Sequence, residues 1–255
     1  MTKPTTRIGT PTSDTNRFRM RGKDVLTEIL GEKSFSEAYY FIVTGKEPTP
    51  GEVKIFDSCL IILMDHGITP NALVARLVEE SVPTDIQVPV AAGLLMVGNK
   101  YAGTMVGTGE ILYRCMNQDG DKRQFLADTV AEYRATKRFV PGFGHPYYNP
   151  IDPRAARLFE IAGNNGATGE YIELVTMLGE EIDKAAGRHL TLNVTGALGA
   201  VLNEIGFPVE VMRAVSVVGR AAGLVAHIYE EKRNPIVPAV TAFVNSIEYL
   251  EPDQE

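Results

Sequence analysis

The sequence has few of the residues that form disulfide bonds or metal sites. Only two cysteines occur among its 255 residues, Cys59 and Cys115, and they form no CxxC pair. A disulfide framework, a redox pair and a cysteine-rich zinc site therefore find no support. Both cysteines stand among apolar residues, so we expect small buried side chains in a reducing compartment.

Long apolar runs and an excess of positive charge are also missing. The longest apolar run, residues 59–64, is far shorter than the roughly 20 residues that cross a bilayer. Residues 1–20 are polar and lack the apolar core of a signal peptide. The formal charge of −7 opposes non-specific binding of nucleic acid. We therefore expect a cytoplasmic protein with no membrane or nucleic-acid partner, and an anionic substrate would need a local cationic pocket.

Common catalytic motifs are absent as well. The sequence contains no Walker A, GxGxxG, HExxH or GxSxG motif. Its four histidines lie 79, 44 and 38 residues apart, so no local metal-binding motif forms. We expect no bound metal and no permanently bound cofactor.

Helix signals, in contrast, occur along most of the chain. Ser34 followed by Glu37 forms a candidate capping box, Gly45 suits a helix end, and Pro70 suits a first helical turn. Such starts and stops predict roughly nine to eleven helices and an all-α fold. The expected helical ranges include 35–45, 52–65, 70–83, 121–137, 152–162, 169–186, 193–205 and 209–232. Residues 237–244 allow a short strand as an alternative.

The expected organisation is a flexible N-terminal arm, residues 1–21, and one large domain, residues 22–255. A smaller subdomain is placed at about residues 140–215. The glycine-rich stretch 85–112 predicts closely packed helices with a bend near Gly98.

Two polar segments stand out at predicted helix ends. His66 follows an apolar helix, and its position alone favours a capping histidine. His145 follows a glycine-rich loop, and Arg154 comes nine residues later at the start of a helix. A rigid histidine loop followed by an arginine suits a site that binds a carboxylate and polarises a carbonyl. A surface turn with a solvated arginine explains the same residues equally well.

The segment from Pro141 to His145, with Asp152-Pro153-Arg154 after it, resembles the PGxGH…DPR segment of citrate synthases. The spacing between the histidine and the arginine matches that family. The resemblance implies that His145 hydrogen-bonds the keto or hydroxyl oxygen of oxaloacetate or citrate, and that Arg154 binds a substrate carboxylate.

Three other segments resemble the same family, in the same order along the chain. Met64-Asp65-His66-Gly67 is similar to its DHG segment, which implies that His66 contacts the four-carbon acid. Residues 218–233 resemble the GRxxGxxxHxxxxKR helix of the lyase module of ATP-citrate lyase, which implies that Arg220 binds another carboxylate. Leu192-Asn193-Val194-Thr195-Gly196 resembles LNVDG and adds Asn193 to the substrate-binding residues.

Two positions depart from the citrate synthase pattern. Tyr101 stands where citrate synthases carry a catalytic histidine, and the lyase module has an aromatic residue there. The resemblance therefore points towards the lyase branch, with Tyr101 as a hydrogen-bond donor to the thioester or simply a packing aromatic. Thr195 stands where the family has its catalytic aspartate, and a hydroxyl cannot serve as a carboxylate base near neutral pH.

The resemblance implies a citrate synthase-like helical fold with a large and a small domain. It implies a C–C bond lyase or synthase, with His145, His66, Tyr101 and Thr195 at the catalytic positions. Citryl-CoA, cleaved to acetyl-CoA and oxaloacetate, is the default substrate, and coenzyme A enters only as part of that substrate. A homodimer or higher homo-oligomer is expected. Thr195 keeps open a catalytically impaired homologue that binds these ligands or partners an active subunit, and a plain helical scaffold remains a third reading.

Overall fold

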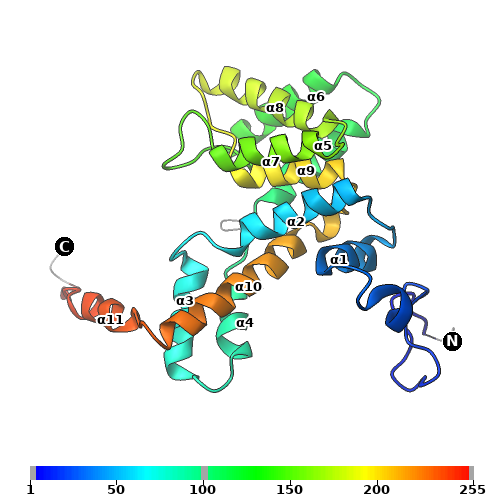
Figure 1. The fold of residues 1–255 in the computed structure, drawn as a ribbon. Coiled ribbons are helices and arrows are strands. Elements are labelled where there is room, and N and C mark those ends of the chain that lie inside the picture. The colour runs from blue at the N-terminus through cyan, green and yellow to red at the C-terminus, as the bar shows by residue number, and fades with distance from the viewer. Residues whose placement is uncertain (1–3, 99–102, 253–255) are drawn as a thin grey trace. The chain divides into compact units, whose positions relative to one another are not determined.

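The computed structural model describes residues 4–98 and 103–252, and this part of the chain is almost entirely helical (Figure 1). Its strands are β1 (Arg19–Met20) and β2 (Lys23–Asp24), which pair antiparallel. A short π-helix and a 3-10 turn span Val25–Ile29 and Val209–Val211. The α-helices are α1 (Phe35–Thr44), α2 (Pro50–Met64), α3 (Pro70–Ser81), α4 (Gln87–Leu95), α5 (Met105–Met116), α6 (Lys122–Ala135), α7 (Pro153–Asn164), α8 (Glu170–Ala186), α9 (Val194–Glu204), α10 (Arg213–Glu231) and α11 (Val237–Asn245). The predicted all-α class is confirmed.

The ends of these helices follow local chemistry. Ser34 Oγ accepts a hydrogen bond from the Glu37 N–H at 3.2 Å, and the Glu37 carboxylate accepts one from the Ser34 N–H at 2.7 Å. This capping box satisfies two amides that the first turn of α1 leaves unpaired. Gly45 ends α1 at φ +74°, a left-handed conformation that glycine adopts without strain. Pro70 is the first residue of α3, as expected.

Two segments differ in detail from what the sequence suggested. Residues 237–244 lie in helix α11 and not in a strand, because Pro238 suits a first helical turn. The stretch 85–112 is interrupted and not merely bent, since α4 ends at Leu95 and α5 begins at Met105.

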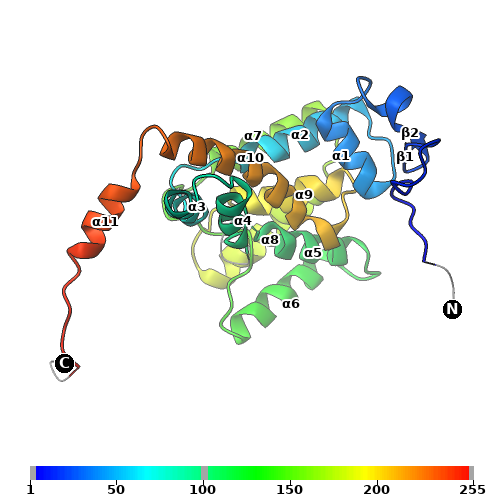
Figure 2. The ribbon, with the colours of Figure 1, turned by 90° about the horizontal axis from the view of Figure 1, so that it is seen from below.

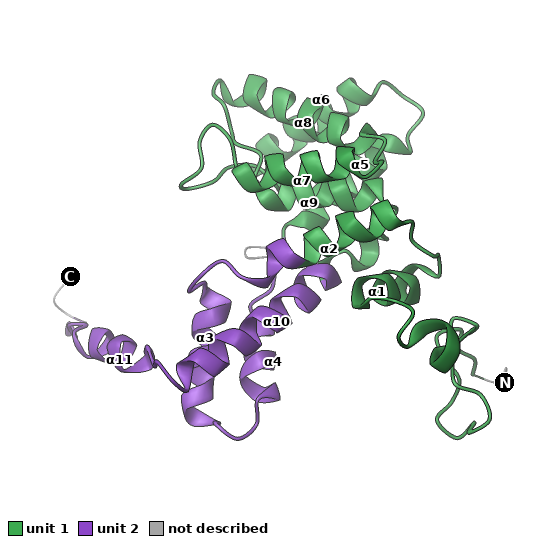
Figure 3. Ribbon diagram, in the orientation of Figure 1, with its two compact units in different colours: residues 1–60, 104–213 green, residues 61–103, 214–255 purple. Residues whose placement is uncertain are grey.

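The chain forms two compact units (Figure 3). Unit 1 contains residues 1–60 and 104–213, and unit 2 contains residues 61–103 and 214–255. The predicted arm, residues 1–21, and the predicted smaller subdomain, about residues 140–215, do not coincide with these two units, and both stay predictions.

Helix α9 is the central helix of unit 1. It packs against α5, α7 and α8, and every residue from Gly196 to Asn203 is buried. Helices α5 and α9 cross closely at Gly199. A Cβ atom added there would lie 2.8 Å from the Met105 carbonyl oxygen, so glycine permits this approach. The apolar core of α5, α6, α8 and α9 includes Ile111, Leu112, Cys115, Leu126, Val130, Leu174, Val175, Leu178, Ile182 and Ala200. Both cysteines are free and buried, as predicted.

Unit 2 is built on α3, α4 and α10, which lie side by side (Figures 1 and 2). Leu224 and Ile228 of α10 pack against Ala72 and Ala75 of α3. Helix α11 extends away from these helices and contacts only α3 appreciably among the described elements. The segment Val209–Glu231 is long and apolar enough to cross a membrane by length and composition, a criterion that buried core helices also meet.

Candidate functional site

The histidine loop of unit 1 is paired along its length with the segment that precedes α9. The Gly144 N–H donates to the Thr191 carbonyl at 2.7 Å, and the Asn193 N–H donates to the Gly142 carbonyl at 3.0 Å. Gly142 has φ +87°, and a side chain there would come within 2.6 Å of the Gly196 Cα. Glycine is therefore required where the loop meets α9, and this pairing brings His145 to the N-terminus of that helix.

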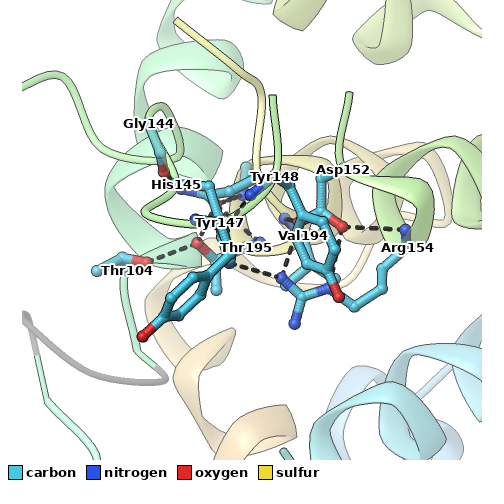
Figure 4. Close-up of polar contacts among 11 residues, drawn as sticks. Thr104, Gly144, His145, Tyr147, Tyr148, Asp152, Arg154, Val194 and Thr195 are labelled. Carbon is cyan, nitrogen blue, oxygen red and sulfur yellow. Dashed lines mark hydrogen bonds and ion pairs between the residues drawn. The ribbon is translucent and has the colours of Figure 1, made fainter. Parts of the chain in front are cut away.

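Asn193 caps α9 and engages Thr195. The Asn193 Oδ1 accepts hydrogen bonds from the Thr195 N–H at 3.1 Å, the Gly196 N–H at 3.2 Å and the Thr195 hydroxyl at 2.6 Å. The Thr104 hydroxyl donates to the Thr195 Oγ1 at 2.7 Å (Figure 4). The Thr195 hydroxyl proton is therefore committed to the cap, and its oxygen already accepts a hydrogen bond from the Thr104 hydroxyl.

Asp152 holds Arg154 against the start of α9. The Asp152 carboxylate accepts from Arg154 Nε at 3.0 Å and from Arg154 Nη2 at 2.8 Å. It also accepts from the Arg154 N–H at 3.0 Å and from the Val194 N–H at 2.9 Å. Burial raises the pKa of this carboxyl, but the hydrogen bonds and charge of Arg154 outweigh burial and hold the pKa below its ordinary value. The aspartate is thus an ionised, buried anchor for the arginine.

His145 has a defined tautomer when it is neutral. Its Nδ1 lies 3.1 Å from the Tyr147 N–H and 3.0 Å from the Tyr148 N–H. Backbone amides only donate, so Nδ1 accepts and the ring proton is assigned to Nε2. Arg154 Nη2 lies 3.2 Å from that Nε2, so both ring nitrogens of His145 face donors, and with this tautomer two donors meet at Nε2 (Figure 4). Such a pair suits a carbonyl, hydroxyl or carboxylate oxygen.

Tyr148 supports both members of this pair. Its ring lies 4.5 Å from the His145 ring, centroid to centroid, and the Arg154 guanidinium carbon lies 5.0 Å from its centroid. The ring therefore fixes the imidazole and attracts the cation across its face. His145, Asp152 and Arg154 are called the Arg154 group below.

Unit 2 carries a second set of the same residue types, placed by a helix crossing. A side chain at Gly223 of α10 would come within 1.7 Å of the Met64 carbonyl oxygen, so α10 crosses the end of α2 in near contact. The crossing leaves Arg220 on one side of Gly223 and His227 on the other, beside the Asp65–Gly67 turn. His227 Nε2 lies 2.8 Å from Asp65 Oδ1, and the Gly67 N–H donates to Asp65 Oδ2 at 3.0 Å.

Arg220 is the unusual member of this second set. The residue is 5% exposed, and its buried Nε and Nη1 find no hydrogen-bond acceptor among the described residues. Burial lowers the pKa of this guanidinium, and the charge of Asp65 opposes that shift. A buried cation whose donors are unsatisfied is costly, and an anionic ligand would satisfy it. Asp65, Arg220 and His227 are called the Arg220 group below.

The predicted site residues thus fall into two sets. His145, Arg154, Asn193 and Thr195 lie together in unit 1, and His66 and Arg220 lie in unit 2. Asn193 uses its amide for the α9 cap and for a bond to the Gly144 carbonyl at 3.0 Å, so its predicted substrate contact stays a prediction. Tyr101 lies outside the described residues.

Sequence reasoning gave no role to several residues that organise these sets. Asp152 was quoted only as part of a motif, although an aspartate directly before Pro-Arg is an N-cap signal that marks it. Thr104 and Tyr148 carried no local signal. His227 is the histidine of the GRxxGxxxHxxxxKR resemblance over residues 218–233, which assigned it no role.

Comparison with known proteins identifies the family and the fold. A family model described as citrate synthase, C-terminal domain, matches residues 8–238. A solved citryl-CoA lyase from Hydrogenobacter thermophilus is 32% identical, with a TM-score of 0.85, and the match covers 98% of this chain and 96% of that one. A solved ATP citrate lyase from Methanothrix soehngenii, in complex with citrate and coenzyme A, shares the fold at 22% identity and a TM-score of 0.76, over 100% of this chain and 43% of that one.

Curated relatives give a consistent picture. A citrate synthase from Heyndrickxia coagulans is 26% identical over 222 residues, which cover 86% of this chain and 58% of that protein. One from Saccharolobus solfataricus is 28% identical over 205 residues, which cover 77% and 52%. The chain therefore spans little more than half the length of these two proteins.

Proposed function

The chain belongs to the citrate synthase family, and from this premise we propose that it is a C–C bond lyase or synthase. Its proposed substrate is an acyl-CoA thioester of a hydroxy-polycarboxylate, by default citryl-CoA, which yields acetyl-CoA and oxaloacetate. Coenzyme A enters as part of the substrate. The observation that carries the proposal is the buried Arg220 guanidinium, whose Nε and Nη1 find no acceptor among the described residues. A substrate carboxylate would supply both missing acceptors.

The proposed cleavage is a retro-aldol step. A base takes the proton of the tertiary hydroxyl, the C–C bond breaks, and its electron pair forms the enolate of the thioester. A proton delivered to that enolate completes acetyl-CoA, and the hydroxyl carbon becomes the ketone of oxaloacetate. Histidine side chains are common general acids and bases in enzymes, so we assign the proton transfers to His145 and His66.

The same proposal assigns the carboxylates to Arg154 and Arg220. A guanidinium binds a carboxylate through two parallel hydrogen bonds and so orients the bond that breaks. The Nε2 proton of His145 and the Nη2 of Arg154 point to one place, which suits the oxygen that becomes the ketone. Tyr101 as donor to the thioester oxygen stays a prediction.

Thr195 supports a second candidate, a homologue that binds these ligands with little turnover. Its hydroxyl donates to Asn193 Oδ1 and accepts from Thr104. Its side chain therefore provides no base for the carbon acid of acetyl-CoA. On this proposal the chain senses or binds the polycarboxylate, or it partners an active subunit.

Two measurements on the purified protein separate the candidates. Release of oxaloacetate from citryl-CoA or methylcitryl-CoA, or of the corresponding shorter oxo acid from a malyl-type thioester, supports the lyase. Saturable binding of citrate in calorimetry without product supports the binder. Thr195→Asp then restores the family's carboxylate at the α9 N-terminus, where the helix dipole favours a negative charge. A gain of about 10²-fold or more in turnover would identify an impaired homologue.

The cytoplasmic location and the homodimer or higher homo-oligomer also stay proposals. Light scattering after size-exclusion chromatography measures the oligomeric state directly. A monomeric mass at micromolar concentration would contradict it.

A further inference from the structure

A chain of hydrogen bonds leads from the interior of unit 2 to the turn that carries His66. Arg76 of α3 is 1% exposed, and its Nε and Nη2 lie 3.3 Å and 3.2 Å from His227 Nδ1. His227 Nε2 lies 2.8 Å from Asp65 Oδ1. Asp65 directly precedes His66, and its negative charge opposes the lowering of the Arg220 pKa by burial. This series of hydrogen bonds therefore joins a buried arginine, a histidine and a carboxylate beside the candidate anion site.

The charge state of each member follows from its neighbours. A guanidinium carries only donors and keeps its proton, so His227 Nδ1 must accept from Arg76. The remaining ring proton then lies on Nε2 and is donated to the Asp65 carboxylate. His189 in unit 1 provides a contrast, because both of its ring nitrogens face acceptors, Asp183 Oδ2 at 2.7 Å and the Pro150 carbonyl at 2.8 Å.

The attachment of α3 to α10 does not depend on the histidine. Arg76 Nη1 donates to Glu231 Oε2 at 2.8 Å, and Arg76 Nη2 is also paired with Glu230. The other oxygen of Glu231 accepts from the Ile236 and Val237 N–H groups at 2.8 Å and 3.0 Å. The ion pairs thus hold the helices, while the bond from His227 ends on a carboxylate that is 57% exposed.

We propose that His227 is a positioning residue that holds the Asp65 carboxylate beside Arg220 but out of a direct ion pair with it. Asp65 Oδ1 is held by His227 and Asp65 Oδ2 by the Gly67 N–H. The buried Nε and Nη1 of Arg220 consequently keep their protons available for a ligand carboxylate. Without the histidine, Asp65 is free to rotate onto the guanidinium and compete with the ligand. The inference rests on the proposed function, because it assigns Arg220 to a polycarboxylate.

The test measures the dissociation constant of citrate by calorimetry on the full chain. His227→Leu removes the donor, and we expect binding to weaken about tenfold, the equivalent of one hydrogen bond to a charged group. His227→Gln keeps an N–H donor within reach of Asp65 and should recover most of that loss. Glu230→Gln is the matched control, because it alters the partners of Arg76 while it leaves the His227–Asp65 bond in place.

The decisive test is a double variant. When Asp65→Asn is added to His227→Leu, we expect it to strengthen citrate binding. Asp65→Asn in the His227→Leu background removes the competing charge, so citrate binding should return to within about threefold of Asp65→Asn alone. A merely structural histidine predicts additive losses instead. Citrate affinity unchanged in His227→Leu, or additive losses in the double variant, would overturn the inference and leave the proposed function standing.

A ligand-independent readout guards against variants that fail to fold. NMR of the imidazole nitrogens of the unmodified protein should show the His227 ring protonated on Nε2, with Nδ1 as an acceptor. Protonation on Nδ1 would overturn the inference whatever the variants do. If the unmodified protein binds neither citrate nor a coenzyme A thioester, the proposed function fails and the inference fails with it.

Discussion

The Arg154 group and the Arg220 group use the same three residue types but treat the arginine in opposite ways. Arg154 is bound through two nitrogens by Asp152, whose side chain is fully buried. Arg220 is itself buried, and the aspartate beside it is turned towards His227 and Gly67. One group contains its own counter-charge, and the other needs an acceptor that the described residues do not supply.

This difference indicates which substitutions should change the catalytic rate, the free energy of unfolding or the affinity for citrate. In the Arg154 group, removal of any member disturbs a completed set of bonds. In the Arg220 group, removal of the arginine relieves an uncompensated charge. The following changes test that distinction, beginning with the largest expected effect.

His145→Ala should lower kcat by about 10²–10⁴-fold if the chain is a lyase. The reason is that the Nε2 proton, directed by the two bonds to Nδ1, disappears from the place that receives the substrate oxygen. Steady-state kinetics with citryl-CoA provides the measurement. His145→Gln keeps an amide near the Nε2 position and should lose less. A fall confined to KM would contradict a role in the chemical step.

Asp152→Ala should lower the free energy of unfolding by about 3–5 kcal/mol, because it removes the buried carboxylate that neutralises the Arg154 guanidinium and accepts from the Val194 N–H. Denaturant unfolding measures this. Asp121→Ala is the matched control, since Asp121 caps α6 through one bond at an exposed site and its loss should cost about 1 kcal/mol.

The Asp152 carboxylate also predicts a pH dependence of stability. The pKa of Asp152 is lowered in the folded chain, so its contribution is complete above the unfolded carboxyl pKa of about 4 and is lost as pH falls through the folded value. The stability difference between the unmodified protein and Asp152→Asn should therefore shrink below about pH 4. A difference that stays constant into acid would contradict the ionised anchor.

Arg154→Met and Arg220→Met should change stability in opposite directions. Arg154→Met leaves the Asp152 carboxylate buried without its cation and should destabilise the chain by about 3 kcal/mol. Arg220→Met removes buried donors without acceptors and should leave stability unchanged or raise it by about 1 kcal/mol. Thermal unfolding with and without citrate adds a second readout, because Arg220→Met should abolish the stabilisation by citrate. Two losses of similar size would refute the distinction.

His189→Gln gives the smallest expected effect and contrasts the two His–Asp pairs. The hydrogen bond to Asp183 and then the bond to the Pro150 carbonyl raise the pKa of His189. Its contribution is therefore present below the unfolded pKa of about 6.5 and is lost as pH rises through the folded value. The pair is half exposed, so we expect about 0.5 kcal/mol at acidic pH and none well above neutrality. An effect that grows with pH would contradict this assignment.

Helix ends were largely predictable because their causes lie within a few residues. The Ser34–Glu37 capping box, the left-handed Gly45 and the first-turn Pro70 are all present as expected. The histidine loop was predictable for the same reason, since two glycines and two prolines within six residues exclude a helix. The break between α4 and α5 was not, because small residues fit a packed helix and its end equally well.

Partners across the fold were not predictable in this way. Asp152 meets the Val194 N–H 42 residues later, and His227 meets Asp65 across 162 residues. No periodicity reports such pairs, because each depends on how a loop closes on a helix or on how two helices cross. The resemblance named His145, Arg154, His66 and Arg220 but not the residues that hold them.

Local chemistry thus decided the helical class and most helix boundaries, and the family resemblance of the sequence named the candidate histidines and arginines. Folding decided which carboxylate each cation meets. Asp152 reaches Arg154 within one turn, and the loop pairing beside α9 buries that bond. The close crossing at Gly223 buries Arg220 while His227 holds Asp65 aside. Charge and hydrogen-bonding capacity belong to each residue, whereas burial and partnership exist only after distant segments pack together.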